Sequence, residues 1–372
     1  MHDTVRMEVM ANTFRARTEW RVWSAYLRAR EGLQDFKNPE EVLKPLPSAD
    51  ARYSCLADLW LRHRRFQDST YESVLQFWAA FRACHFCFED LKPYVLGLPR
   101  RQQISFRQHI ASDCRDLYSS TNTDFVRWIN AETNALKFEY LLTVGLLQPP
   151  NTEFLQAFVR NALNLWRLGL RQQLYTPDLP VLICSALIRY HEIDPDSRHL
   201  LQAAYILEKA AKDNNARAKV LLVYIYGELG LFSRAIRRYQ DLSIKEMQHD
   251  TFGHALMTRI SIGHPFGPHS RMDDYGDVSS MMGRAFFSMR DTSQKIMDNQ
   301  IQIADNGRSD LLLELAELRD RLDFSISHRI MYLEQRRLGR LTNRALDPKY
   351  TGNTCTYSVA ERIQRDYSLT VP

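Results

Sequence analysis

Cys84-His85-Phe86-Cys87 combines two thiols and an imidazole at the spacing of a metal-ligand pair, and its cysteines could also carry redox chemistry. A structural zinc site needs four ligands. No second CxxC or HxxxH pair lies near this motif in the sequence. Because the motif also lies within a strongly apolar stretch that we predict to be helical, we interpret its thiols as buried core groups.

The other histidines and carboxylates also lack the spacing of known sites. His191 and His199 do not form an HExxH motif, which places two imidazoles on one helical face. Asp273 and Asp274 are adjacent in a predicted loop without further oxygen ligands, so we expect solvated side chains there. The six cysteines are dispersed through apolar stretches, which is typical of reduced, buried thiols.

Motifs that cradle phosphates or activate a nucleophile are missing from the sequence. The chain contains no GxxxxGK[ST], no GxGxxG and no GxSxG motif. The segment most similar to an acetyl-CoA-binding turn is Arg336-Arg337-Leu338-Gly339-Arg340-Leu341, which fails at its last residue. That segment also ends a predicted helix instead of following a strand. We therefore predict no catalytic residues, no cofactor and no metal in this chain.

The sequence has few turn residues and no convincing strand pattern, so we predict that helices make up the fold and position any residues that bind a partner. The 372 residues exceed a usual single core, and Gly and Pro number 14 each. Short breaks join the predicted helices, so successive helices should run antiparallel. We predict helices at about 18–32, 51–66, 70–91, 99–118, 124–147, 152–173, 178–191, 198–212, 248–262, 278–305 and 309–341.

The most informative stretch is a helical hairpin between Arg198 and Leu242. Five of its residues are spaced 4, 4, 5 and 4 apart, as in a tetratricopeptide-like unit: Leu222, Tyr226, Gly230, Ala235 and Tyr239. The glycine supplies a permissive turn, and the alanine lets the two helices approach closely. Such a unit cannot bury its apolar face alone, so it predicts stacked neighbours and a surface that holds other proteins. The expected fold is an all-α, αα-hairpin superhelix with long C-terminal helices.

The composition also bounds the organisation and location of the chain. Residues 1–20 carry Arg6, Arg15 and Arg17, so we expect no secretory leader, and no apolar run is long enough for a membrane helix. We expect a cytoplasmic protein. The predicted parts are an N-terminal helix with a Pro-rich connection (1–50), a helical-repeat array (51–262), an ordered Pro/Gly loop (263–277), long helices packing on the array (278–345) and a tail (346–372).

Two segments carry a family resemblance. One is CFEDLKPY at 87–94, and the other is LGLFSRAIRRYQDLSIKEMQHDTFGHALMTRISI at 229–262. They resemble the auxiliary, non-catalytic subunit of the NatB N-terminal acetyltransferase complex, and the tryptophan-rich stretch at 20–26 is also similar. The family has a segment of the form x-L-x-I-K-x-x-Q-x-D-T, carried here by Leu242, Ile244, Lys245, Gln248, Asp250 and Thr251.

The resemblance implies a helical superhelix that cradles a small catalytic acetyltransferase subunit. It places that subunit at the ribosome, where nascent chains beginning Met-Asp, Met-Glu, Met-Asn or Met-Gln are acetylated. Acetyl-CoA would be bound by the catalytic partner, which agrees with the missing cofactor motif. Members of the family are longer, so the resemblance implies that this chain is the middle-to-late portion, as a fragment, a truncated gene model or a reduced homologue.

Arginine clusters are the remaining binding signal. They can meet phosphates or acidic protein surfaces, but the net charge of +5 is mild and solvated faces are the alternative. No direct DNA binding and no membrane contact are expected. The candidate contacts with the partner or ribosome are Arg234, Arg237, Arg238, Arg337, Arg340 and Arg344. The competing hypotheses are an independent helical-repeat adaptor that contacts RNA or the ribosome through these arginines, and an enzyme in its own right.

Overall fold

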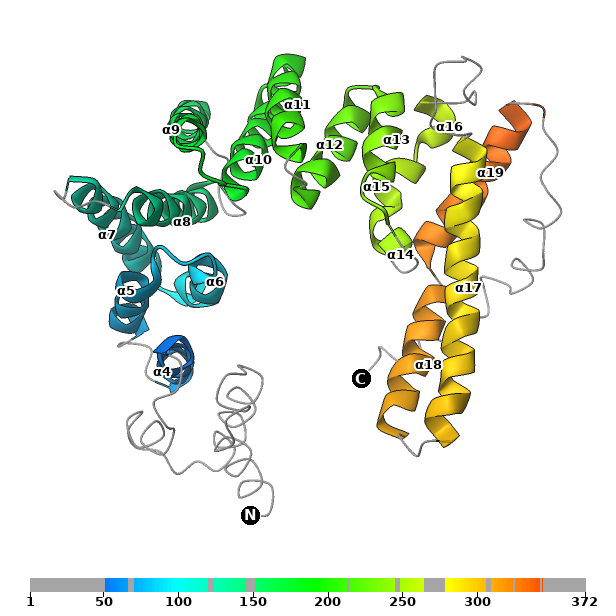
Figure 1. Ribbon diagram of the computed structural model, residues 1–372, viewed down its shortest axis with the longest axis horizontal. Coiled ribbons are helices and arrows are strands. Elements are labelled where there is room, and N and C mark those ends of the chain that lie inside the picture. The colour runs from blue at the N-terminus through cyan, green and yellow to red at the C-terminus, as the bar shows by residue number, and fades with distance from the viewer. Residues whose placement is uncertain are drawn as a thin grey trace. The chain divides into compact units, whose positions relative to one another are not determined.

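The computed structural model describes residues 51–65, 70–119, 124–144, 151–212, 215–244, 248–263, 278–305, 309–323, 325–341 and 343. All regular structure in these ranges is α-helical, which confirms the predicted all-α class (Figure 1). The chain divides into two compact units, Met1–Pro195 and Asp196–Pro372, which we describe separately. The predicted helix at 18–32, the tail at 346–372 and nearly all of the loop at 263–277 lie outside the described residues.

In the first unit, several helices pack on the next helix in the chain: α4 on α5, α7 on α8, and α9 on α10. Asp124 and Asn151 cap two of these helices, because their side chains accept hydrogen bonds from the first free backbone N–H groups. The helices of this unit are α4 (Ala51–Arg65), α5 (Thr70–Phe81), α6 (Cys87–Gly97), α7 (Arg100–Ser119), α8 (Phe125–Thr143), α9 (Thr152–Arg171) and α10 (Asp178–Ile193).

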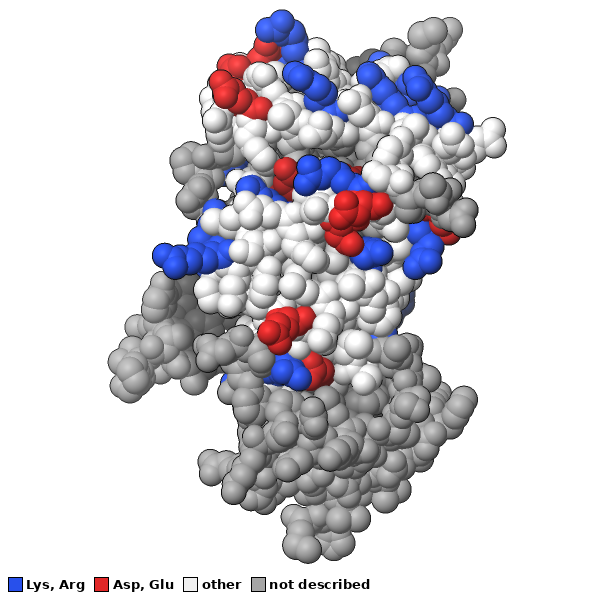
Figure 2. Space-filling view, turned by 90° about the vertical axis from the view of Figure 1, so that its left-hand side faces the viewer, with Lys and Arg blue, Asp and Glu red and all other residues white. Residues whose placement is uncertain are grey.

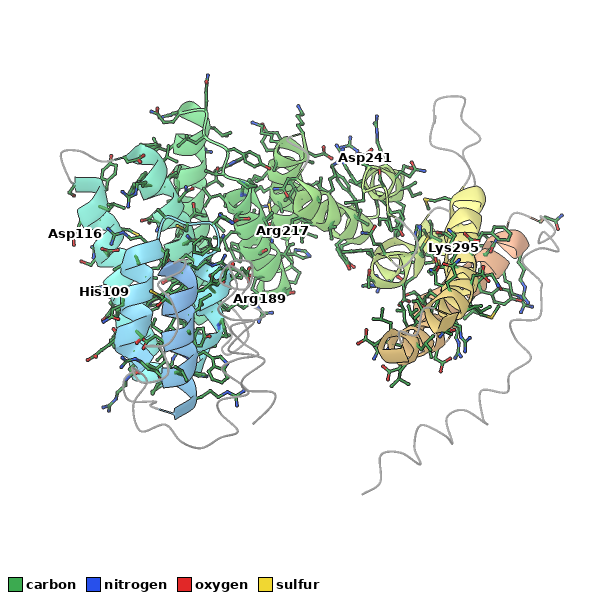
Figure 3. The ribbon with its side chains drawn as sticks, turned by 60° about the horizontal axis from the view of Figure 1, so that its bottom comes forward. His109, Asp116, Arg189, Arg217, Asp241 and Lys295 are labelled. Atoms are coloured by element: carbon green, nitrogen blue, oxygen red, sulfur yellow. The ribbon has the colours of Figure 1, made fainter. Side chains whose placement is uncertain are left out.

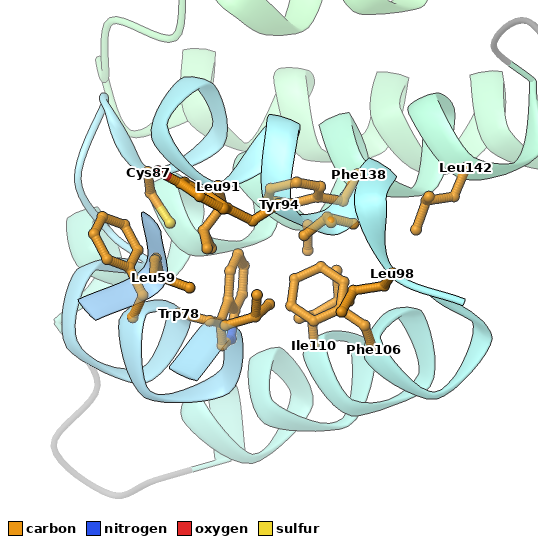
Figure 4. Close-up of a cluster of buried hydrophobic side chains, with 14 of the residues drawn as sticks. Leu59, Trp78, Cys87, Leu91, Tyr94, Leu98, Phe106, Ile110, Phe138 and Leu142 are labelled. Carbon is orange, nitrogen blue, oxygen red and sulfur yellow. The ribbon is translucent and has the colours of Figure 1, made fainter. Parts of the chain in front are cut away.

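An aromatic core joins α5, α7 and α8 (Figure 4). Trp78, Phe106 and Phe138 are each fully buried and meet edge to face, with ring centroids 5.2 to 6.2 Å apart. The indole N–H of Trp78 donates to a carboxylate oxygen of Asp113 at 2.9 Å, so the one polar atom of this ring is satisfied. These contacts form a packed centre for α5, α7 and α8.

The structure corrects the predicted helix at 70–91, which is two helices. α5 ends at Phe81, and α6 begins at Cys87 and continues through Pro93 to Gly97. The side-chain amide of Asn134, on α8, donates to the backbone oxygens of Arg82 and Cys84 at 2.8 and 2.9 Å. These oxygens would accept from the next turn if the helix continued, so Asn134 stabilises the break between α5 and α6.

The second unit begins with three helices that pack in sequence, α11 on α12 and α12 on α13. Farther along, α17 packs against both α18 and α19 (Figure 1). The helices are α11 (Ser197–Ala211), α12 (Ala216–Glu228), α13 (Phe232–Gln240), α14 (Gln248–Phe252), α15 (His254–Met257), α16 (Ile260–Gly263), α17 (Val278–Asp305), α18 (Ser309–Asp323) and α19 (Ile326–Leu341).

Two further helix predictions are wrong in the second unit. The segment predicted as one helix at 248–262 forms the three short helices α14 to α16, and the one at 309–341 breaks between α18 and α19. The break after α14 and the break between α18 and α19 lie where these two segments meet. The hydroxyl of Ser325 donates to the carboxylate of Asp250, and that of Ser327 donates to the Asp250 backbone oxygen at 2.6 Å. Contacts distant in sequence therefore end these helices.

No helix among the described residues combines the length and apolar character needed to cross a membrane.

Candidate partner-binding hairpin

The turn between α12 and α13 is built around Gly230, which has a φ of +71°. The N–H of Leu231 donates to the Tyr226 backbone oxygen at 2.8 Å, and the N–H of Gly230 donates to that of Gly227 at 3.1 Å. This pair of hydrogen bonds is a Schellman motif, which needs a left-handed residue at the glycine position. The motif provides hydrogen-bond donors for the last carbonyl groups of α12, and the chain then continues into α13.

The four other hairpin residues named from the sequence are all buried. Leu222 and Tyr226 lie on α12, and Ala235 and Tyr239 lie on α13, with at most 3% of each residue exposed. The structure therefore brings these residues into the packed interior of the second unit. They shape the hairpin, and its outer surface is formed by other side chains.

A hydrogen-bonded network that the sequence did not predict ties three helices together. The carboxylate of Glu208, on α11, accepts from the hydroxyl of Tyr226 at 2.6 Å and from two guanidinium nitrogens of Arg238, one of them at 3.1 Å. Arg238 also donates to Asp241 at 2.8 Å, at the C-terminal end of α13 (Figure 3). One half-buried carboxylate thus joins α11, α12 and α13.

This network shifts the pKa values of its members. Burial acts to raise the pKa of Glu208, but the hydrogen bonds from Arg238 and Tyr226, together with the positive charges of Arg238 and Arg234, outweigh burial, so the pKa lies below its ordinary value. Burial, followed by the hydrogen bond to Glu208, raises the pKa of Tyr226. The ionised carboxylate and the neutral phenol are therefore the stable forms in the folded hairpin.

The three candidate arginines of α13 differ in what they contact. Arg238 is turned toward Glu208 and Asp241, with 24% of its side chain exposed. Arg234 is exposed and its guanidinium lies 5.9 Å from the ring centroid of Tyr226. Arg237 is exposed on the same helix. Arg234 is therefore exposed but interacts with Tyr226 and Glu208, whereas Arg237 is exposed on α13 and takes no part in the pairing of Arg238 with Glu208.

The candidate arginines of the C-terminal helices separate in a similar way. Arg337 forms an ion pair with Glu334, whose side chain is 1% exposed and also accepts from the backbone N–H of Ser261 at 3.0 Å. Arg340 is exposed one turn later on α19. Arg344 lies outside the described residues. Both arginines are thus exposed, and Arg337 in addition pairs with a buried carboxylate.

Cys84, His85 and Phe86 lie in the turn between α5 and α6, and Cys87 is the first residue of α6, which corrects the predicted place of the motif within one helix. Cys87 is fully buried and Cys84 is half-buried, and burial raises the pKa of the Cys87 thiol well above its ordinary value. Searching the described part of the chain finds no group of three or more His, Cys, Asp or Glu side chains that could hold a metal ion.

Charged side chains do not cover the molecule evenly. In the face seen in Figure 2, basic groups extend across the upper part, and acidic groups there gather toward the upper left. A basic cluster that the sequence analysis did not identify lies on α9, where Arg160, Arg167 and Arg171 are all exposed. The missed signal is their separation by 7 and 4 residues, which places them on one helical face.

These features define an all-α protein: packed helices, polar networks that fix their geometry, and exposed arginines on the helix surfaces. The chain belongs to the family described as the N-acetyltransferase B complex (NatB) non-catalytic subunit, whose model matches residues 20–368. The family is that of the non-catalytic subunit, so the prediction that this chain is not an enzyme agrees with it.

Individual relatives bear similar names. The chain is 28% identical over 275 residues to the human "N-alpha-acetyltransferase 25, NatB auxiliary subunit", covering 68% of this chain and 26% of the relative. It is 26% identical over 344 residues to the Schizosaccharomyces pombe "N-terminal acetyltransferase B complex subunit arm1", covering 87% of this chain and 41% of the relative. The chain therefore spans less than half of the length of these curated relatives.

Proposed function

We propose that this chain forms part of the scaffold that holds the catalytic subunit of a NatB-type N-terminal acetyltransferase complex. The family match over residues 20–368 carries the proposal. The packed helices support it, because stacked helical hairpins, with α12 and α13 as a tetratricopeptide-like unit, provide extended surfaces for holding another protein. The catalytic subunit would bind acetyl-CoA and carry out the acetyl transfer.

The proposal extends to where the complex acts. The scaffold would place the catalytic subunit at the ribosome in the cytoplasm, on nascent chains that begin Met-Asp, Met-Glu, Met-Asn or Met-Gln. Arg234, Arg237 and Arg340 are the accessible candidate contacts, because each is exposed on the outside of its helix. Arg238 and Arg337 would act indirectly, through the intramolecular ion pairs that hold α13 and α19 in place.

The length of the relatives adds a further element to the proposal. The matched region is 26% of the human relative and 41% of the fission-yeast relative. We propose that this chain corresponds to a portion of a longer scaffold, whose other part would add more helical hairpins to the same array.

Co-purification tests the proposal directly. The tagged 372-residue chain would be co-expressed with a NatB catalytic subunit and purified. We expect one stable complex by size-exclusion chromatography, which acetylates a Met-Asp peptide with acetyl-CoA and leaves a Met-Ala peptide unmodified. A chain that is helical by circular dichroism but binds no catalytic subunit would rule out the scaffold role for this portion.

The second candidate function is an independent helical-repeat adaptor that contacts RNA or the ribosome through its arginines. The exposed positions of Arg237 and Arg340 favour it. Ribosome binding that needs no acetyltransferase subunit and weakens steeply with salt would support the adaptor. Binding that appears only when the catalytic subunit is present would exclude it.

A further inference from the structure

The outer face of α9 carries a stripe of arginines. Arg160, Arg167 and Arg171 are exposed and fall within about 40° of one another around the helix, with Asn164 beside them. The rise of a helix separates the first two by roughly 10 Å and the last two by roughly 6 Å. The opposite face of α9 is buried, through Leu155, Phe158, Ala162, Leu165, Trp166 and Gly169.

The one acidic residue of α9, Glu153, lies two turns before Arg160 on the same helical face, and no ion pair joins the two side chains. Residues 154–177 contain no Asp and no Glu. Within the described part of the chain, the side chains of Arg160, Arg167 and Arg171 take part in no ion pair or hydrogen bond. The carboxylates of the next helix are engaged elsewhere, since Asp178 pairs with Lys137 and Glu192 pairs with Arg189. Three positive charges therefore face solvent together.

The C-terminal end of the stripe adds polar and aromatic groups. Gln173 has a φ of +55°, a left-handed conformation that non-glycine residues seldom adopt. The helix ends there because the N–H of Leu174 donates to the Gly169 backbone oxygen at 2.9 Å. Two residues beyond Gln173, Tyr175 is 64% exposed, so an unstacked aromatic ring lies close to Arg171 in the chain.

We propose that the arginine stripe of α9 binds the phosphodiester backbone of RNA, with Tyr175 stacking on an exposed base. A guanidinium matches the geometry of a phosphate through two parallel hydrogen bonds. The spacing along α9 suits a chain of repeated phosphates, and Tyr175 supplies the ring that single-stranded RNA uses for stacking. An acidic protein fits less well, because Leu170 is the one large apolar side chain exposed along the helix itself, and protein interfaces need an apolar centre.

This inference deepens the proposed contact with the ribosome and rests on it for the source of the RNA in cells. It does not depend on the catalytic subunit, because the three arginines and Tyr175 all belong to this chain and lie in its first unit, Met1–Pro195. A failure to bind RNA would leave the scaffold role intact, and a failure to bind the catalytic subunit would leave the stripe intact. The two measurements therefore separate the two proposals.

Fluorescence anisotropy tests the stripe, with the full chain and a labelled single-stranded RNA of about 15 nucleotides as the probe. The R160Q/R167Q/R171Q variant should bind at least about tenfold more weakly at low salt, and its plot of log affinity against log salt should be shallower by about 2–3. Y175L should weaken binding by about tenfold and leave the salt slope unchanged.

The control removes the same charge elsewhere. Arg259, Lys295 and Arg321 are exposed and each lies beside an exposed carboxylate, so the R259Q/K295Q/R321Q variant should keep RNA affinity within about twofold. Circular dichroism checks that both triple variants stay folded. Equal losses in both variants would overturn the proposal, because net charge alone would then explain binding. Tighter binding of a polyglutamate peptide than of RNA would overturn it in favour of an acidic protein.

Discussion

Arg238 and Glu208 lie 30 residues apart in the sequence and meet through two hydrogen bonds, which join α13 to α11. Tyr226 of α12 donates to the same carboxylate, so the three helices share one acceptor group. A residue that the sequence marks as a candidate partner contact is thus part of the protein's own framework. A mutation of Arg238 therefore measures two effects at once, because losing its pair with Glu208 destabilises the hairpin and can by itself reduce partner binding.

The first prediction separates the two neighbouring arginines. Arg238→Glu places a second carboxylate against Glu208, and we expect it to lower the free energy of unfolding by about 1–3 kcal/mol. Arg237→Glu, at an exposed position, should lower stability less than Arg238→Glu does, and it should weaken partner or ribosome association. Urea unfolding and pull-down assays measure the two effects. Equal stability of both variants would show that the Glu208 pair contributes nothing.

The second prediction concerns acid. Because the pKa of Glu208 is lowered in the folded state, its pairing stabilises the fold above the ordinary carboxylate pKa of 4.5. That contribution is lost as the pH falls through the folded-state pKa. Wild type should therefore have a higher Tm than Glu208→Gln at pH 7, and the difference should shrink as the pH falls below 4.5. A difference in Tm that does not change with pH would contradict the assigned role of the ionised carboxylate.

The third prediction tests the turn of the hairpin. Gly230 has a φ of +71° and open space around its α-carbon, so Gly230→Val introduces backbone strain without a clash. We expect a loss of at least about 1–2 kcal/mol in unfolding free energy, and a smaller loss for Gly230→Asn, since Asn tolerates this conformation.

A matched control lies three residues earlier. Gly227 is inside α12 and also has open space around its α-carbon. Gly227→Ala should stabilise the protein by about 0.5–1 kcal/mol, because alanine favours a helix. Thermal melts followed by circular dichroism compare the three variants. If Gly230→Val melts at the wild-type temperature, the left-handed turn is not required.

The fourth prediction addresses the break between α5 and α6. Asn134→Ala removes the donor group for the backbone oxygens of Arg82 and Cys84 and should lower the free energy of unfolding by about 2–4 kcal/mol. Asn134→Asp should be at least as damaging, because it turns a donor toward two acceptors into a third acceptor. Guanidinium unfolding gives both values. Wild-type stability of the alanine variant would mean that the break forms without Asn134.

The fifth prediction distinguishes an arginine of α19 that stabilises the fold from one that is a candidate contact with a partner. Arg337→Ala removes the ion-pair partner of the buried Glu334 and should lower the free energy of unfolding by about 1–3 kcal/mol. Arg340→Ala, one turn later on an exposed position, should leave the Tm unchanged and report only on partner or ribosome association. A Tm loss in both variants would assign the two arginines to the framework.

Local sequence predicted a large part of the fold because much of a helix is decided locally. Asp124 and Asn151 mark the starts of α8 and α9 through their own side-chain hydrogen bonds to the next residues, and the predicted starts at 124 and 152 agree with the structure to within one residue. Prediction failed where a distant residue decides the outcome. Asn134 ends α5 from 50 residues away, and Ser325 meets Asp250 from 75 residues away.

The sequence by itself determined the all-α class and the family, because helical periodicity, helix caps and family-specific segments depend only on residues that are close together along the chain. Only the tertiary structure decided which arginines pair with carboxylates of the protein itself. Arg238 and Arg337 turn toward buried or half-buried carboxylates, whereas Arg160, Arg167 and Arg171 share one solvent-facing stripe. The physical reason is that an ion pair depends on the distance between groups in space, and packing, not spacing along the chain, sets that distance.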